Sequence, residues 1–359
     1  MLNLFRDSLC SFLVLPDEIM EPLALPDKWI GLSILQKAIR RGDTAKAASA
    51  ALALLPLDRS GLWRRLLTIA FEDVGIGDEN AVSMCAAAVE SPTWRAEMGG
   101  DARVAVTLCK LLAEGVKDRS ADHLICAARS HPDWEEVREA AGSRPLADRV
   151  RMVEDASLPI ADRITAAWFA SGVEWYPERR VGAGDLDGLM DALQSAGAAP
   201  GMVAATRVGI RRVGHPIVLV PAMLSAVTTG EPHRWEARSV PQETCVNGLP
   251  LHAYDQFTRL GKAAIARFAR QNNAVRTVLE RFVPDRKWEA ATGLGVFFAE
   301  GSQVAKCRVW SDAINPERLG READFESQGV DMSAADPVIN VVGENLQDLN
   351  RIRMELLRH

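Results

Sequence analysis

The sequence predicts an all-α protein built as a helical bundle. Two observations predict this class. Apolar residues recur at three- and four-residue steps along most of the chain, and caps or glycines bracket these runs. Alternating strand patterns are scarce: the best short one is Pro216–Val220, and Pro221 together with the helical context argues against it. No strict repeat period is visible in the sequence, so a regular solenoid is disfavoured.

The first helix with well-defined ends is expected over residues 28–41. Its apolar face is formed by Trp29, Leu32, Leu35 and Ile39. Its cations, expected to face outward, are Lys37, Arg40 and Arg41. Gly42 is typical of a helix C-terminus, and Asp43 is a typical N-cap for a following helix over 44–55. Pro56 is expected to end that helix.

The same pattern predicts helices along the rest of the chain. Ser60 is expected to cap a helix over 61–71. Further helices are expected over 79–89, 102–114, 120–129, 134–141, 147–153, 159–170, 186–196, 201–213, 216–227, 251–270, 274–282, 287–299, 302–312 and 344–358. Breaks rich in glycine, proline or polar residues are expected at 176–184 and 228–250. The predicted organisation is an N-terminal extension over 1–27, a helical domain over 28–175, and a second helical domain over 185–359 with a loop at 228–250.

Composition excludes several classes of protein. The chain has 359 residues, enough for two or three domains, and a net charge of −6, which argues against a broadly basic DNA-wrapping surface but not against a local basic stripe. The six cysteines lack the spacing of a zinc site or a disulfide framework. No run of about 18 apolar residues is present, so no membrane partner is expected. The N-terminal apolar run lacks a signal-peptide pattern, so a cytoplasmic location is expected.

Two motifs in the first third of the chain are the most informative. The first is Gly31-Leu-Ser-Ile-Leu-Gln-Lys-Ala-Ile-Arg-Arg-Gly-Asp43, and the second is Trp63-Arg-Arg-Leu-Leu-Thr-Ile-Ala-Phe-Glu-Asp-Val-Gly-Ile-Gly-Asp78. In the second motif an arginine pair, an acidic pair and a glycine turn stand in register. Over about residues 28–130, these motifs make the chain similar to the C-terminal helical region of the bacterial replication-associated recombination ATPases, clamp-loader relatives related to the Werner-interacting ATPase. The matching positions are Ser33, Lys37, Gly42, Asp43, Arg64, Arg65, Leu66, Ala70, Glu72, Asp73, Val74, Gly75 and Asp78.

The resemblance implies a clamp-loader-collar-like module that holds subunits together in proteins of DNA replication and recombination. It does not extend to ATP hydrolysis. A phosphate-binding loop needs the GxxxxGK[ST] pattern after a strand, whereas the only Gly-Lys pair here, Gly261-Lys262, lies in a helical pattern and is followed by Ala263. The leading hypothesis is therefore a non-catalytic, self-associating helical protein with a replication or recombination partner.

Charged residues of the two motifs are the candidate contacts for a partner subunit or for DNA. They are Lys37, Arg40, Arg41, Arg64, Arg65, Glu72 and Asp73. Arginines facing carboxylates across a subunit contact would fix its register. The cations could instead bind DNA phosphates, or all these residues could form ordinary surface ion pairs.

An enzyme or a small-ligand-binding protein is the alternative. Its pocket would lie in the 250–312 helices, where His252, Asp255 and Arg259 share one face if the segment is helical. A third metal ligand cannot be identified there. No other catalytic pattern appears, so the sequence predicts no catalytic residue, no metal and no cofactor.

Overall fold

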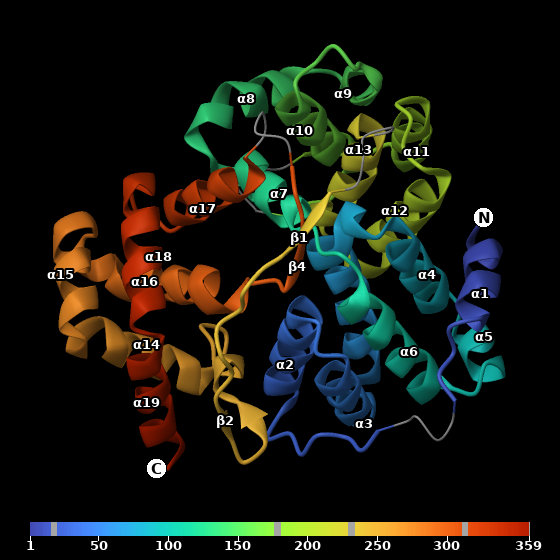
Figure 1. Cartoon of the computed structure of the whole chain (residues 1–359). Helices are drawn as coiled ribbons and strands as arrows, with labels where there is room; N and C mark the ends of the chain where they lie inside the picture. Colours follow the sequence, from blue (N-terminus) through green and yellow to red (C-terminus); the bar gives the residue numbers. More distant parts are fainter. Residues whose placement is uncertain (16–19, 176–180, 229–233, 311–314, 359) are drawn as a thin grey trace.

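The structure, a computed structural model, describes residues 1–15, 20–175, 181–228, 234–310 and 315–358. These residues form helices α1 to α19 and four strands of two or three residues each (Figure 1), which confirms the all-α class. The helices of the first half are α1 (Leu2–Cys10), α2 (Lys28–Arg41), α3 (Thr44–Ile69), α4 (Glu79–Glu90), α5 (Pro92–Glu97), α6 (Asp101–Glu114), α7 (Ser120–Ser130), α8 (Glu135–Ser143), α9 (Leu146–Glu154) and α10 (Ile160–Ser171).

The second half continues with α11 (Leu186–Ser195), α12 (Pro200–Val213), α13 (Val220–Val227), α14 (Arg259–Gln271), α15 (Asn273–Phe282), α16 (Trp288–Val296), α17 (Pro316–Ser327), α18 (Ala335–Glu344) and α19 (Leu346–Leu357). The strands are β1 (Trp235–Ala237), β2 (Cys245–Val246), β3 (Leu249–Pro250) and β4 (Lys306–Arg308), with β1 antiparallel to β4 and β2 antiparallel to β3. No helix among the described residues is long and apolar enough to cross a membrane.

The predicted end of α2 at Gly42 and the predicted cap at Asp43 are confirmed, and the structure adds a cap at Asp27 that was not predicted. Asp27 caps α2 by accepting from two backbone amides, and Gly42 ends it in the left-handed region at φ 74°. The Asp43 side chain accepts from the amide of Lys46 and caps α3. The expected interruption near Pro56 is a kink inside α3 at Asp58, whose carboxylate, and not Ser60, accepts from the amide of Gly61.

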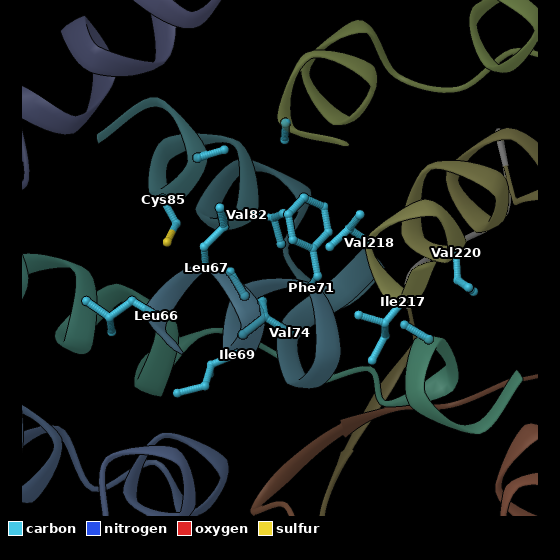
Figure 2. Close-up of a cluster of buried hydrophobic side chains, with 14 of the residues drawn as sticks. Leu66, Leu67, Ile69, Phe71, Val74, Val82, Cys85, Ile217, Val218 and Val220 are labelled. Carbon is cyan, nitrogen blue, oxygen red and sulfur yellow. The ribbon is translucent and has the colours of Figure 1, made fainter. Parts of the chain in front are cut away.

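The segment that follows α3 contributes buried residues to the larger core. Residues Ala70–Val74 widen into one π-helical turn, and Gly75–Gly77 continue as a 3-10 turn before α4. Figure 2 shows Phe71 and Val74 of this turn packed among side chains of α4 and of the segment at 217–220. Gly209 of α12 is required here, because a Cβ would lie 2.9 Å from the Phe71 ring.

The buried apolar residues form two cores. The first extends from Leu9 to Tyr254 and includes Ala323 of α17, whereas the second lies among α14, α15, α16, α18 and α19, the orange and red helices gathered on one side of Figure 1. The boundary between cores therefore falls near residue 255. A domain boundary had been expected at 176–184, of which residues 176–180 lie outside the described part.

Several expectations about the second half were wrong. Residues 251–253 form a 3-10 turn and α14 begins only at Arg259, so the expected helix over 251–270 is not continuous. Residues 306–308 form β4, so no helix spans the described part of 302–312. Residues 235–237 pair with β4, and the hairpin of β2 and β3 turns at Asn247-Gly248, both with positive φ, as an Asn-Gly turn requires.

The outward face predicted for α2 was also wrong. Lys37 and Arg40 are buried, with 5% and 3% of their surfaces exposed, whereas Trp29, expected in the core, is 60% exposed. Segments distant in sequence supply carboxylates and carbonyls that cover Lys37 and Arg40, whereas Leu32, Leu35 and Ile39 are buried as predicted.

Candidate functional site

A buried network of charges joins α2 to the turn after α3. Asp73, fully buried, accepts from Arg40 Nε at 2.7 Å, from Gln36 Nε2 at 2.9 Å and from Arg119 Nε at 3.0 Å. Arg40 also donates to Glu72 at 2.8 Å. We call Gln36, Arg40, Glu72, Asp73 and Arg119 the Asp73 network.

The π-helical turn positions the acidic pair of this network. Because this turn is one residue wider than an α-helical turn, Glu72 and Asp73 both reach toward α2. The Phe297 ring lies against the guanidinium groups of Arg40 and Arg119, 5.7 and 5.3 Å from its centroid. The network thereby also contacts the segment that follows α16.

Electrostatics separate the two acids. Burial alone would raise the pKa of Asp73, but Arg40 and Arg119 outweigh it and hold that pKa below its usual range. Burial and the neighbouring Asp73 charge raise the pKa of Glu72 to about 7. Two close acids with separated pKa values are one signature of acid–base catalysis. Here both carboxylates already accept from Gln36 and Arg40, so their contacts are those of a structural network.

Lys37 is the centre of a second polar cluster. Its ammonium donates to Ser33 Oγ at 2.8 Å, to the backbone oxygen of His252 at 2.7 Å and to Asp255 Oδ2. Burial lowers the pKa of Lys37, and Asp255 opposes this effect. A serine beside a buried lysine can form a nucleophile and base pair. In this arrangement all three ammonium donors are used and the Ser33 hydroxyl donates to Asp255 at 2.8 Å, so the contacts are those of a structural ion pair.

The alternative pocket does not assemble around His252, Asp255 and Arg259. His252 Nε2 lies 3.0 Å from Glu243 Oε2, and Glu243 also pairs with Lys46 of α3. Asp255 faces α2, and Arg259, at the start of α14, is exposed. The three residues lie on different segments because the 3-10 turn replaces the expected helix.

The remaining predicted cations differ in how far groups of the same chain already bind them. Arg41 donates to the backbone oxygens of Pro241 at 2.7 Å and Glu300 at 3.2 Å. Arg65 is half-buried and donates to Gln36 at 3.3 Å. Arg64 is exposed, and its side chain forms no ion pair with the described residues. Of the seven predicted contact residues, Arg64 and Arg65 are therefore the ones best placed to reach a partner.

Large apolar side chains are exposed around the N-terminal half of α2. They are Trp29, Leu57 and Phe257, with exposed fractions of 60%, 53% and 75%, and we call them the apolar patch. Lys28 donates to Asp58 at 2.9 Å, which brings the start of α2 beside the kink of α3. The Ser33–Asp255 bond brings the segment that carries Phe257 onto α2. The three exposed side chains thus belong to segments held side by side.

A cavity of about 330 Å³ lies between α7, β4 and the start of α17, and it borders the Asp73 network at Arg119. Its wall includes Arg119, His123, Arg238, Arg308 and Trp310. Sequence reasoning missed these residues because they come from three segments far apart in sequence, and no local spacing shows that such segments are neighbours. Within the described ranges no three His, Cys, Asp or Glu side chains gather as metal ligands would.

Comparison of the chain with protein-family models, with curated proteins and with solved structures finds no match.

Proposed function

We propose that this chain is a non-catalytic helical protein that self-associates through the face formed by α2 and the second half of α3, and that it acts by protein contacts in DNA replication or recombination. The observation that carries the proposal is the apolar patch. Large apolar side chains exposed on neighbouring segments are typical of protein–protein contacts. The two motifs at 31–43 and 63–78 support the assignment to replication, since they resemble a region that assembles subunits.

Burial of the apolar patch would supply part of the free energy of association, and the contacts around the patch would supply the rest. Burying the exposed parts of the three apolar side chains would contribute roughly 3–5 kcal/mol per subunit, scaled from full burial of such residues. Arg64 and Arg65 lie on the same half of α3 and supply the charged rim. The acidic pair is engaged within the chain, so the proposal assigns the complementary carboxylates to other surface positions of the partner.

The test is the light-scattering mass of the purified protein over a range of concentrations. We expect a discrete multiple of the 39.1 kDa chain mass. Trp29→Ser and Phe257→Ser should each lower that mass toward one chain, because each removes an exposed aromatic anchor. Arg64→Glu should weaken assembly further at low salt than at high salt, because salt screens surface charges.

Met332→Ser is the matched control, since Met332 is exposed but lies among the C-terminal helices. It should keep the wild-type mass. A chain that stays monomeric at every concentration, or patch variants that keep the oligomer mass, would contradict the proposal.

Direct DNA contact is tested in the same experiment. Forked DNA is added at low and moderate salt, and a contact made by Arg64 and Arg65 predicts binding that weakens steeply with salt. Binding that is unchanged in Arg64→Glu would exclude that residue as the contact.

A further inference from the structure

The cavity between α7, β4 and the start of α17 is walled by segments far apart in sequence. The start of α7, the residues that follow α16, β4 and the start of α17 each supply part of the wall. The pairing of β1 with β4, and the bond from the amide of Lys117 to the backbone oxygen of Lys306 at 2.8 Å, join these segments. Val309 lines the cavity and is 40% exposed, so the cavity is reached from solvent beside this residue.

The charged groups of the wall are paired within the chain. The pairs are Arg119 with Asp73 and Asp122, Arg238 with Glu236 and Glu317, and Arg308 with Asp118. The two helix starts are occupied as well: Asp118 accepts from the amide of Ser120 at 2.8 Å, and Asn315 caps α17. A charged ligand would lose its hydration here without gaining an unpaired opposite charge. The wall therefore favours an uncharged ligand.

His123 is the polar group of the wall that points to a ligand. Only 8% of the residue is exposed, it lines the cavity, and neither ring nitrogen has a hydrogen-bond partner among the described residues. Burial, followed by the charge of Arg119, lowers the pKa of His123 to about 3, so near pH 7 the neutral ring has one N–H donor and one nitrogen acceptor. Leaving buried polar groups unpaired costs free energy, so a ligand that supplies the missing hydrogen bond is favoured.

Flat side chains lie around the cavity and beside this imidazole. The His123 ring lies nearly parallel to that of Phe298, with centroids 6.5 Å apart and 22° between the planes. Gly320 lets α17 approach the imidazole closely, since a Cβ there would lie 2.4 Å from Nδ1. Trp310 lines the cavity, and the Arg308 guanidinium lies 5.3 Å from the centroid of its ring. Aromatic rings and guanidinium planes stack on other flat groups, which favours a planar aromatic ligand.

We propose that this cavity binds a small uncharged heteroaromatic ring, such as a nucleobase, which forms a hydrogen bond with His123 and lies beside Trp310. The volume of about 330 Å³ is at the lower end of the range for small-molecule sites and suits a ligand of this size. A ring with both an N–H group and a bare ring nitrogen can pair with either tautomer of the neutral imidazole. No residue of the apolar patch lines the cavity, so the inference is independent of the proposed self-association.

The test is isothermal titration calorimetry of the full chain with adenine and with benzimidazole. Their counterpart is 1-methylindole, a flat bicyclic ring with neither an N–H group nor a bare ring nitrogen. We expect saturable binding of adenine or benzimidazole at one site per chain. Binding of 1-methylindole should be about tenfold weaker or less, because it leaves His123 unpaired. AMP should bind no more tightly than adenosine, because the cations of the wall are already paired.

Two variants locate the site. His123→Phe keeps an aromatic ring and removes both nitrogens, so it should weaken binding by about tenfold. Val309→Trp should weaken binding by narrowing the cavity from an exposed position. Met332→Trp is the matched control, because Met332 is exposed and lies outside the cavity, and it should leave binding unchanged. Thermal melts verify that each variant remains folded.

The proposal is overturned if neither adenine nor benzimidazole binds saturably, or if 1-methylindole binds as tightly as they do. Wild-type binding by His123→Phe or by Val309→Trp would overturn it as well. Tighter binding of AMP than of adenosine would overturn the assignment of an uncharged ligand.

Discussion

Replacing Asp73 with asparagine tests whether the motif charges act within the chain. The substitution preserves the shape of the side chain and removes the charge on which Arg40 and Arg119 converge. Both guanidinium groups are almost fully buried, so the loss leaves two cations with Glu72 as their nearest shared carboxylate. Removing one partner of a buried ion pair costs about 3–5 kcal/mol. Because Glu72 partly compensates, we expect a loss near 3 kcal/mol.

The assay is urea denaturation, followed in parallel by far-UV circular dichroism and by tryptophan fluorescence. Glu289→Gln is the control, because its partner Arg270 lies 3.2 Å away and both side chains are more than half exposed. Exposed pairs contribute about 0–1 kcal/mol, so the control should lie within that range. The loss in Asp73→Asn should also be independent of protein concentration, since the bonds it breaks lie within one chain.

Two results would refute this reasoning. A loss in Asp73→Asn no larger than in Glu289→Gln would mean that the network contributes little to stability. A loss that grows steeply on dilution would mean that Asp73 acts at a contact between chains, as its place in the motif first suggested.

Two other predictions concern backbone strain and pH. Gly75→Ala should destabilise the protein by about 2 kcal/mol or more, because Gly75 has φ 48° and a Cβ would lie 2.8 Å from the Asp118 carbonyl oxygen. Gly343→Ala, within α18, is the control and should be neutral or stabilising in the same denaturation assay. Equal effects of the two substitutions would disprove the strain argument. Burial lowers the pKa of His215 to about 4, and its Nδ1 accepts from the amide of Ile217 at 3.1 Å. The unfolded chain therefore binds more protons between pH 6.5 and 4, so stability falls as pH is lowered through that window. His215→Asn can keep the bond without titrating, so its melts from pH 7 to 5 should show a shallower loss, and parallel losses would contradict this role.

Local signals made the first motif predictable. Gly42 and Asp43 act through hydrogen bonds or backbone angles confined to a few neighbouring residues. Such signals are visible in sequence, since the interacting groups are three or four positions apart. The scarcity of strand patterns predicted the fold class for the same reason.

The polar side of α2 was not predictable in this way. The spacing of Lys37 and Arg40 predicts exposed side chains, because it fits the outer face of an amphipathic helix. Their partners lie far away in sequence: Asp255 for Lys37, and Asp73 with the backbone oxygen of Gly301 for Arg40. A single sequence contains no signal that pairs residues 37 and 255, so burial of these cations could be learned only from the fold.

The error at residues 251–270 has a specific physical origin, and it explains how the two cores are joined. Helical spacing is present from 251 onward, but Gly261 permits a different path: a Cβ there would lie 1.9 Å from the backbone oxygen of Asp255. The segment before α14 can therefore fold back against the first turn of that helix, which turns Asp255 toward α2 and leaves Phe257 exposed. One glycine thus permits both the ion pair with Lys37 and the exposure of an apolar side chain in the proposed assembly face. Gly261→Ala should consequently disturb stability and self-association together, whereas Phe257→Ser should affect self-association alone.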